Sequence, residues 1–276
     1  MMGQYLIAFR ETFEAALVSA IMFSYLIRTG RSELTRFVWY GIYLAVGLST
    51  GLGALISFTY GILPKPFQLL FEAAAAFVAV VVLSSIIFWM AVRGRHFKKE
   101  IEKRIESTIT GGTIVGLLTI SFIIVFREGL ETVLFLTPFL LNETMATIAG
   151  SVAGIISALI LSYGIFAAGM KINLRKFFYF TSLLLIFLAS GLAGYSVHEL
   201  IEYYEQNGFN LGWLAEPAYV LNLPEENILH HKNIVGSILA VMFGYTVEAE
   251  WARIIVHLLY LAISLPFIIW VYRRRK

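Results

Sequence analysis

Long apolar segments recur along the chain, and polar residues gather between them. A helix that crosses the hydrocarbon core of a bilayer needs about 20 mainly apolar residues. On this criterion the sequence predicts seven membrane-spanning helices, near residues 3–27, 37–62, 67–92, 110–137, 145–170, 177–202 and 250–272. The predicted fold class is therefore all-α and polytopic, with residues 1–276 forming a single transmembrane domain.

The composition agrees with a membrane protein. Hydrophobic residues make up 59% of the 276 residues and charged residues only 14%, whereas soluble domains have roughly 25% charged residues. The net charge of +3 is small and forms no patch that could follow a phosphate backbone, so we expect no nucleic-acid partner. Cysteine is absent, which excludes thiolate metal sites and iron–sulfur clusters. Any bound metal must meet oxygen or imidazole ligands.

The basic residues predict the orientation in the membrane. Most of the 21 Lys and Arg residues lie in the connectors after the first, third and fifth spans and in the tail after the seventh. With seven spans these segments share one side, and positive charge marks the cytoplasmic side. We therefore expect a multi-pass protein of the cell membrane with its N-terminus outside and its C-terminus in the cytoplasm. The basic connector 93–106 is expected to lie on anionic membrane lipid as a surface helix.

Two clusters of charge interrupt the first and fourth spans. The sequence reads Phe-Arg-Glu-Thr-Phe-Glu at 9–14 and Phe-Arg-Glu-Gly-Leu-Glu at 126–131. Ionisable residues are costly in hydrocarbon, so the repetition of an R-E-x-x-E motif indicates a function rather than chance. On a helix the two glutamates lie one turn apart on one face, and the arginine reaches the second glutamate four residues on.

The motifs also predict an internal repeat. The first span runs inward and the fourth runs outward, although both carry the same motif. This predicts a 3+3 inverted repeat of residues 1–93 and 107–203, and substrate sites in such folds lie near the midplane between the repeats. After the repeats we expect an extracytoplasmic segment at 204–249, with a short membrane-surface or re-entrant helix at 234–243. A seventh helix with a basic tail is expected at 250–276. The motifs can meet only if both lie close to the midplane.

The chemistry of the motifs points to a metal ion. If the motifs face each other, four carboxylates come together, from Glu11, Glu14, Glu128 and Glu131. Carboxylate oxygens are ligands for hard cations, and an empty cage of carboxylates repels itself until it binds protons or a cation. We expect Arg10 and Arg127 to orient the glutamates and balance their charge. The alternative is a pair of self-neutralising Arg–Glu contacts that only join spans.

Further polar residues are weaker candidates. Glu72 lies in the third span with no basic neighbour in sequence, so it could be a further metal ligand or line an entrance. His198, Glu199 and Glu202, near the outer end of the sixth span, could form a secondary site that passes metal to the cage, although a wetted helix end explains them nearly as well. Glu250 reads as the solvated start of the last span.

Neither enzymatic chemistry nor a bound cofactor is expected. The string that starts at His198 lacks the second histidine of a zinc-protease helix. No nucleophile–base pair, phosphate loop or cofactor motif is present in the sequence. Glycine pairs at four-residue spacing, such as Gly47/Gly51 and Gly150/Gly154, instead predict places where helix backbones approach closely.

The chain resembles the oxidase-dependent iron permease family. The resemblance covers the first span to the last and rests on the two R-E-x-x-E motifs, on Phe71-Glu72 followed by Phe88-Trp89-Met90, and on Phe243-Gly244-Tyr245. It implies seven spans, inward movement of iron, with ferric iron preferred as the transported substrate, and carboxylate ligands in both motifs. Any oxidase or iron-binding partner is expected to be a separate extracytoplasmic chain that docks at 204–249. The family's Gly-Leu pair is kept at 129–130, but the first motif has Thr12-Phe13.

Two other functions stay open on the sequence. Hard-oxygen chemistry does not select valence, so the transported ion could be divalent: Fe²⁺, Mn²⁺ or Pb²⁺. A non-transporting membrane assembly subunit, in which the Arg–Glu pairs only join spans, is the alternative of a different class.

Overall fold

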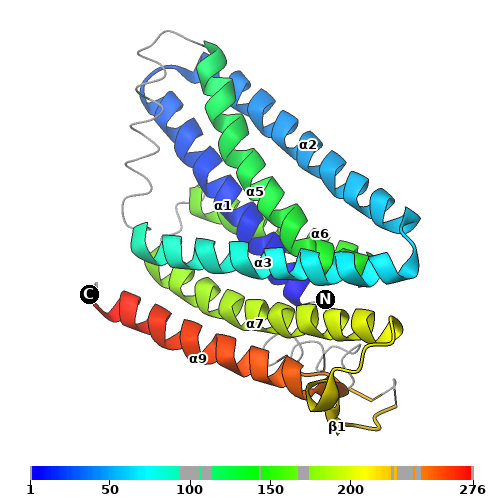
Figure 1. Cartoon of the computed structure of the whole chain (residues 1–276). Coiled ribbons are helices and arrows are strands. Elements are labelled where there is room, and N and C mark those ends of the chain that lie inside the picture. Colours follow the sequence, from blue (N-terminus) through cyan, green and yellow to red (C-terminus); the bar gives the residue numbers. More distant parts are fainter. Residues whose placement is uncertain are drawn as a thin grey trace.

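The computed structural model describes residues 2–93, 106, 114–142, 144–166, 174–224, 227–228, 236, 239 and 244–274. These residues form seven long helices: α1 (Met2–Arg28), α2 (Thr35–Ile62), α3 (Lys65–Arg93), α5 (Ile114–Asn142), α6 (Thr144–Phe166), α7 (Leu174–Gln206) and α9 (Trp251–Arg274). The expected helical fold is confirmed, and each helix overlaps one predicted span. Helices α3, α7 and α9 lie side by side, and α1, α2 and α5 run steeply across them (Figure 1).

The helices differ in how well their composition suits a membrane. Five of the described helices, α2, α3, α6, α7 and α9, are long and apolar enough to cross a bilayer. Helices α1 and α5 have similar lengths, but each carries an arginine and two glutamates within its length. Whether α1 and α5 also cross the membrane therefore depends on where these charges point.

Local sequence signals explain the connections around α2. After α1, Gly30 adopts a left-handed conformation with φ 72°, and the Arg31 N–H donates to the Leu26 carbonyl at 2.8 Å. This is the Schellman arrangement, which satisfies the last helical carbonyls and favours glycine. Helix α2 ends at Ile62. The next residue, Leu63, has an extended backbone with ψ 140°, which is the conformation that Pro64 imposes on the residue before it.

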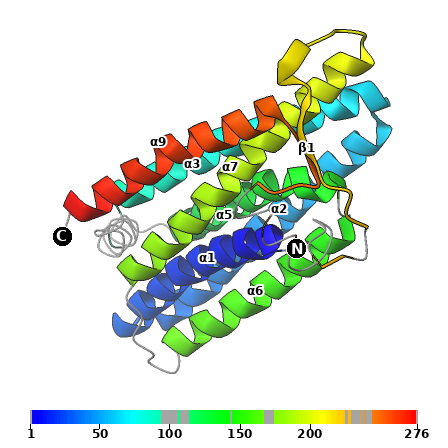
Figure 2. The same ribbon diagram turned by 90° about the horizontal axis from the view of Figure 1, so that it is seen from below.

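The most extensive contacts between helices are those of α1 with α6, α2 with α5, and α3 with α7. Figure 2 shows α1 beside α6. If α1, α2 and α3 correspond to α5, α6 and α7, then α1–α6 and α2–α5 are equivalent pairs, and α3–α7 is the pair on the symmetry axis. This pairing is the one that an inverted repeat would produce, and the repeat itself stays a prediction.

Glycines allow two of these pairs to approach closely. A Cβ at Gly129 of α5 would lie 2.1 Å from the Ser49 Oγ of α2, and a Cβ at Gly154 of α6 would lie 2.5 Å from the Tyr5 carbonyl oxygen of α1. The expectation of close packing is therefore met at Gly154. It is wrong for Gly47 and Gly51, because a Cβ at either position would meet no atom within 4 Å.

Apolar packing encloses the charged part of α1 along the helix. Ile7 belongs to a buried cluster that also draws on α3, α5, α7 and α9. Leu17 belongs to a second buried cluster, formed with α2 and α5. The charged residues 10–14 lie between these two clusters, so apolar side chains cover them on both sides.

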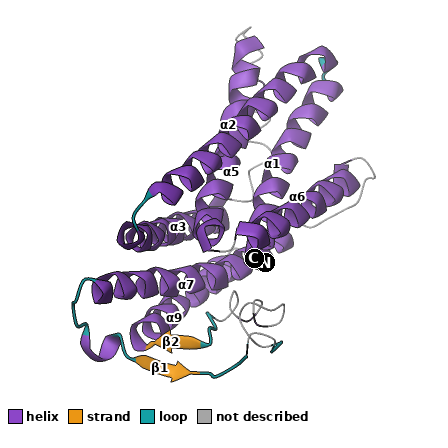
Figure 3. Ribbon diagram, turned by 90° about the vertical axis from the view of Figure 1, so that its right-hand side faces the viewer, coloured by secondary structure: helices purple, strands orange, loops and turns teal. Residues whose placement is uncertain are grey.

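The segment between α7 and α9 contains a small sheet that the sequence did not predict. Strand β1 (Pro217–Val220) pairs antiparallel with β2 (Glu248–Glu250), with Val220 opposite Glu248. Figure 3 shows the two strands next to α9. The short helix expected at 234–243 lies outside the described residues except for 236 and 239, and the connector 94–105 lies outside them altogether.

Candidate metal site

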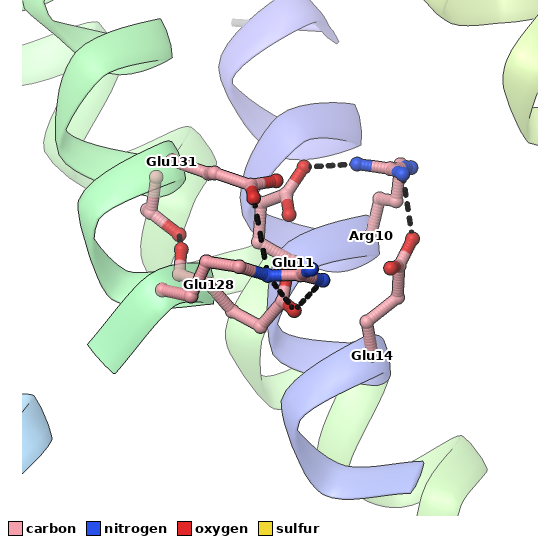
Figure 4. Close-up of polar contacts among 7 residues, drawn as sticks. Arg10, Glu11, Glu14, Glu128 and Glu131 are labelled. Atoms are coloured by element: carbon pink, nitrogen blue, oxygen red, sulfur yellow. Dashed lines mark hydrogen bonds and ion pairs between the residues drawn. The ribbon is translucent and has the colours of Figure 1, made fainter. Parts of the chain in front are cut away.

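The two R-E-x-x-E motifs face each other across the contact between α1 and α5. Figure 4 shows Glu11 of α1 turned toward Glu128 and Glu131 of α5, with Arg10 and Glu14 beside it on α1. The residue exposures are 2% for Arg10, 1% for Glu11 and 2% for Glu128. The charges of these three residues therefore point away from the outer surface of the bundle.

Each arginine binds both glutamates of its own motif. Arg10 forms an ion pair with the neighbouring Glu11, and its Nη2 lies 2.8 Å from Glu14 Oε1. Arg127 Nη2 lies 2.6 Å from Glu128 Oε1, and its Nε lies 3.4 Å from Glu131 Oε1. The contact four residues on is as expected, whereas the contact with the adjacent glutamate was not anticipated. Each guanidinium thus fixes the direction of two carboxylates.

Three of the four motif glutamates form a compact donor group. One carboxylate oxygen from each of Glu11, Glu128 and Glu131 lies within 4.8 Å of the others. Among the described residues, the Oε2 atoms of these three glutamates are buried without a hydrogen-bond partner. Buried carboxylate oxygens without partners carry a large desolvation penalty, which a cation at this point would offset.

Glu14 lies at the edge of this group. It is 3% exposed and contacts Arg10, but it is not part of the three-carboxylate group. The structure thus brings Glu11, Glu128 and Glu131 together directly, and Arg10 connects Glu14 to them.

The two arginines have different surroundings. The side chain of Arg10 is 2% exposed, whereas that of Arg127 is 47% exposed. The sequence gives both arginines the same neighbours at the charged positions, so it provides no sign of this difference. The carboxylate group is consequently closed on the Arg10 side and reaches the molecular surface through Arg127.

Glu72 lies in a different polar group. Its Oε1 accepts a hydrogen bond from the Tyr60 hydroxyl of α2, and its Oε2 accepts one from the Tyr195 hydroxyl of α7. The residue is 5% exposed. Glu72 therefore joins three helices, and both of its oxygens already have donors. The structure does not bring it to the carboxylates of the motifs.

The secondary candidates at the end of α7 do come together. His198, Glu199 and Glu202 each offer one ligand atom, and these atoms lie within 4.8 Å of one another. Glu199 is buried and His198 is partly buried. His198 Nδ1 also lies 2.7 Å from Glu250 Oε1.

Sequence reasoning missed the role of Glu250, which it interpreted as a solvated helix start. The residue is only 9% exposed. The sequence offers no clear signal for this, because alternation along a strand places Glu248 and Glu250 on the same face, whereas the structure leaves Glu248 exposed and buries Glu250.

Long apolar helices with buried carboxylates between them are typical of membrane transport proteins. The chain matches the model of the iron permease FTR1 family over residues 1–270. It is 44% identical over 268 residues to a protein of Archaeoglobus fulgidus described only as uncharacterized, covering 97% of this chain and 94% of that protein. No solved structure was found to match the chain.

Several relatives carry a functional name. The ferrous iron permease EfeU of Yersinia pestis is 33% identical over 264 residues, which cover 95% of this chain and 90% of that protein. The protein of the same name from Escherichia coli O6:H1 is also 33% identical over 264 residues, and the alignment covers 92% of it. The chain belongs to the iron permease FTR1 family, and it is accordingly a membrane protein of iron transport.

Proposed function

We propose that this chain imports iron across the cell membrane through a site to which both R-E-x-x-E motifs contribute. The observation that carries the proposal is the group of Glu11, Glu128 and Glu131, whose oxygens lie within 4.8 Å of one another. Two of these residues come from α5 and one from α1, so the ion is held between the two repeats. Glu14 is proposed as a fourth ligand, whose carboxylate releases Arg10 and binds the ion in its place.

The electrostatic balance favours reversible binding. Two carboxylates about 4 Å apart repel each other by roughly 4 kcal/mol at an effective dielectric constant of 20. A cation removes this repulsion, while Arg10 and Arg127 limit the net negative charge that holds it. The inside-negative potential then favours inward movement by about 2.3 kcal/mol per charge for each 100 mV.

The proposed topology has seven spans, with α1 and α5 crossing the membrane alongside the five apolar helices. The four glutamates and Arg10 are buried inside the bundle, and Arg127 is paired with Glu128 and Glu131, which lowers the cost of placing these charges in hydrocarbon. The N-terminus is outside and the C-terminus is in the cytoplasm, as the distribution of basic residues predicts. The segment 204–249 is then extracytoplasmic, where a separate oxidase or iron-binding protein would deliver the ion.

The imported ion is proposed to be ferric iron, because the site of the motifs contains only oxygen donors, which suit a hard cation. Ferrous iron is the second candidate, and the name of the EfeU relatives, ferrous iron permease, favours it. Uptake of radioactive iron into proteoliposomes, supplied either as ferric citrate or as ferrous iron kept reduced by ascorbate, separates the two. Manganese and lead as competitors test the wider divalent alternative.

The same assay tests the transport site. Glu11→Gln and Glu128→Gln keep the size of the side chain but remove its charge. We expect each to lower uptake at least about tenfold, since changes to residues that only hydrogen-bond to the ligands of a metal already cost that much. Glu205→Gln, at an exposed position of α7, is the matched control. If both motif variants import iron at the wild-type rate, the assembly-subunit alternative replaces this proposal.

A further inference from the structure

The group at the end of α7 has the donors of a second metal site. His198 and Glu202 lie one helical turn apart, Glu199 lies between them in sequence, and their ligand atoms are within 4.8 Å of one another. The group is not made of carboxylates alone, because it includes an imidazole. Three protein ligands would leave further coordination positions for water or for the next ligand along a pathway.

A buried carboxylate from another element orients the histidine. Glu250 Oε1 lies 2.7 Å from His198 Nδ1. Histidines that bind metals generally donate the N–H of one ring nitrogen to a carboxylate, which fixes the ring and leaves the other nitrogen, here Nε2, to coordinate. Glu250 is 9% exposed, and its Oε2 has no hydrogen-bond partner among the described residues. A carboxylate desolvated to this degree is costly, and a positive charge beside His198 would offset the cost.

The backbone holds Glu250 in this position. Glu250 lies opposite Pro217 in the pairing of β1 and β2, and the next N–H, of Trp251, donates to the Glu216 carbonyl at 3.2 Å. The small sheet therefore fixes the segment before α9 against the end of α7. This arrangement gives the sheet a purpose beyond closing the connection between the two helices.

A chain of side-chain contacts runs from this group toward α2. Tyr195 lies one turn before Glu199 on α7, and the two side chains are in contact. The Tyr195 hydroxyl also donates to Glu72, whose other oxygen accepts from Tyr60. The group at the end of α7 is thus connected to polar groups inside the helix bundle and is not an isolated solvated helix end.

We propose that His198, Glu199 and Glu202 form an outer cation site, with Glu250 as its positioning residue, which selects iron over Ca²⁺ and Mg²⁺ before the ion reaches the carboxylates of the motifs. Its place before the motifs rests on the function and topology proposed above. The selectivity follows from donor chemistry: imidazole binds transition metals well, whereas Ca²⁺ and Mg²⁺ prefer oxygen donors. The all-carboxylate site cannot make this distinction through its donor atoms.

Equilibrium dialysis of the detergent-purified full chain against Co²⁺ tests the site without requiring transport. We expect two bound ions per wild-type chain, one after His198→Ala, and one after the double change Glu11→Gln and Glu128→Gln. Glu250→Gln should weaken the outer ion about tenfold and shift its visible absorption, which a purely structural role for Glu250 would not do. Glu205→Gln should behave as wild type, and size-exclusion chromatography should give the same elution profile for every variant.

The proposal would be overturned if the His198→Ala variant bound as many Co²⁺ ions as the wild type, with the same affinity. In uptake assays, His198→Ala should raise the apparent KM for iron about tenfold with kcat retained, and should make uptake sensitive to millimolar Ca²⁺. Wild-type KM and Ca²⁺ resistance in this variant would also contradict it. If His198→Ala loses one Co²⁺ while the motif variants transport normally, the outer site stands and the proposed transport site fails.

Discussion

Gly129 of α5 lies so close to Ser49 of α2 that a Cβ at position 129 would come within 2.1 Å of the Ser49 Oγ and 2.8 Å of its Cβ. Position 129 directly follows Glu128, so this helix contact sets the placement of the second motif. In the α1–α6 pair the glycine lies on the partner helix instead: a Cβ at Gly154 would come within 2.5 Å of the Tyr5 carbonyl oxygen and 2.9 Å of the Phe9 nitrogen.

Gly129→Ala is therefore expected to destabilise the protein by about 1–3 kcal/mol, the usual cost of overpacking, and to lower iron uptake by displacing Glu128. The thermal unfolding of the detergent-purified protein measures the first effect. Gly47→Ala, on α2 where a Cβ would meet nothing within 4 Å, is the control and should be neutral or slightly stabilising. Equal unfolding temperatures for the two variants would contradict the packing argument.

The two arginines should differ in their importance for stability. Arg10→Gln leaves Glu11 and Glu14 buried without their cation, which typically costs about 3–5 kcal/mol. Arg127→Gln should cost less, because the Arg127 side chain is 47% exposed and its contact with Glu131 is longer, at 3.4 Å, than the 2.8 Å contact between Arg10 and Glu14. The yield and the unfolding temperature of the two variants provide the comparison. A larger loss of stability for Arg127→Gln than for Arg10→Gln would show that the difference in burial between the two arginines does not determine their contribution to stability.

Glu72 is predicted to serve stability through its tyrosines. Tyr195→Phe removes the donor to Glu72 Oε2 and should cost about 1.5–3 kcal/mol, the range for hydrogen bonds to charged groups. Tyr163→Phe changes a tyrosine that is 72% exposed and should have little effect. A double-mutant cycle with Glu72→Gln measures the coupling, and additive effects of Tyr195→Phe and Glu72→Gln would show that the contact contributes nothing.

Iron should stabilise the folded protein through its binding sites. A ligand at about 100 times its dissociation constant stabilises the folded state by about 2.7 kcal/mol. We expect added iron to raise the unfolding temperature of the wild type, and chelation to lower it again. Because the outer site also binds the ion, the motif variants should retain part of the rise, and combining them with His198→Ala should abolish it. A full rise in that combined variant would place the stabilising ion elsewhere.

The sequence identified the helices and both motifs because the signals are local. Apolar runs of the length of a membrane predict helices wherever they occur, and Arg10 or Glu128 stands out in such a run without any knowledge of its neighbours. The sequence could not decide whether Glu11 meets Glu128 and Glu131, because this depends on helix tilt and depth, which helical periodicity does not determine.

Contacts between distant segments could not be predicted in the same way. Glu250 reaches His198 through a sheet whose strands are only three and four residues long, too short for an alternating pattern to be distinctive. The spacing of glycines likewise did not reveal which ones face another helix: Gly47 does not, whereas Gly129, which has no glycine four residues away, does. Such contacts depend on which faces of the helices pack together.

The central claim is that carboxylates of α1 and α5 hold one iron ion together. Anomalous diffraction at the iron absorption edge, from crystals of the protein soaked in iron, tests it most directly. We predict a peak bounded by Glu11, Glu128 and Glu131 that disappears in Glu128→Gln, with a separate peak beside His198. Crystals that bind iron elsewhere but show no peak between α1 and α5 would contradict the account.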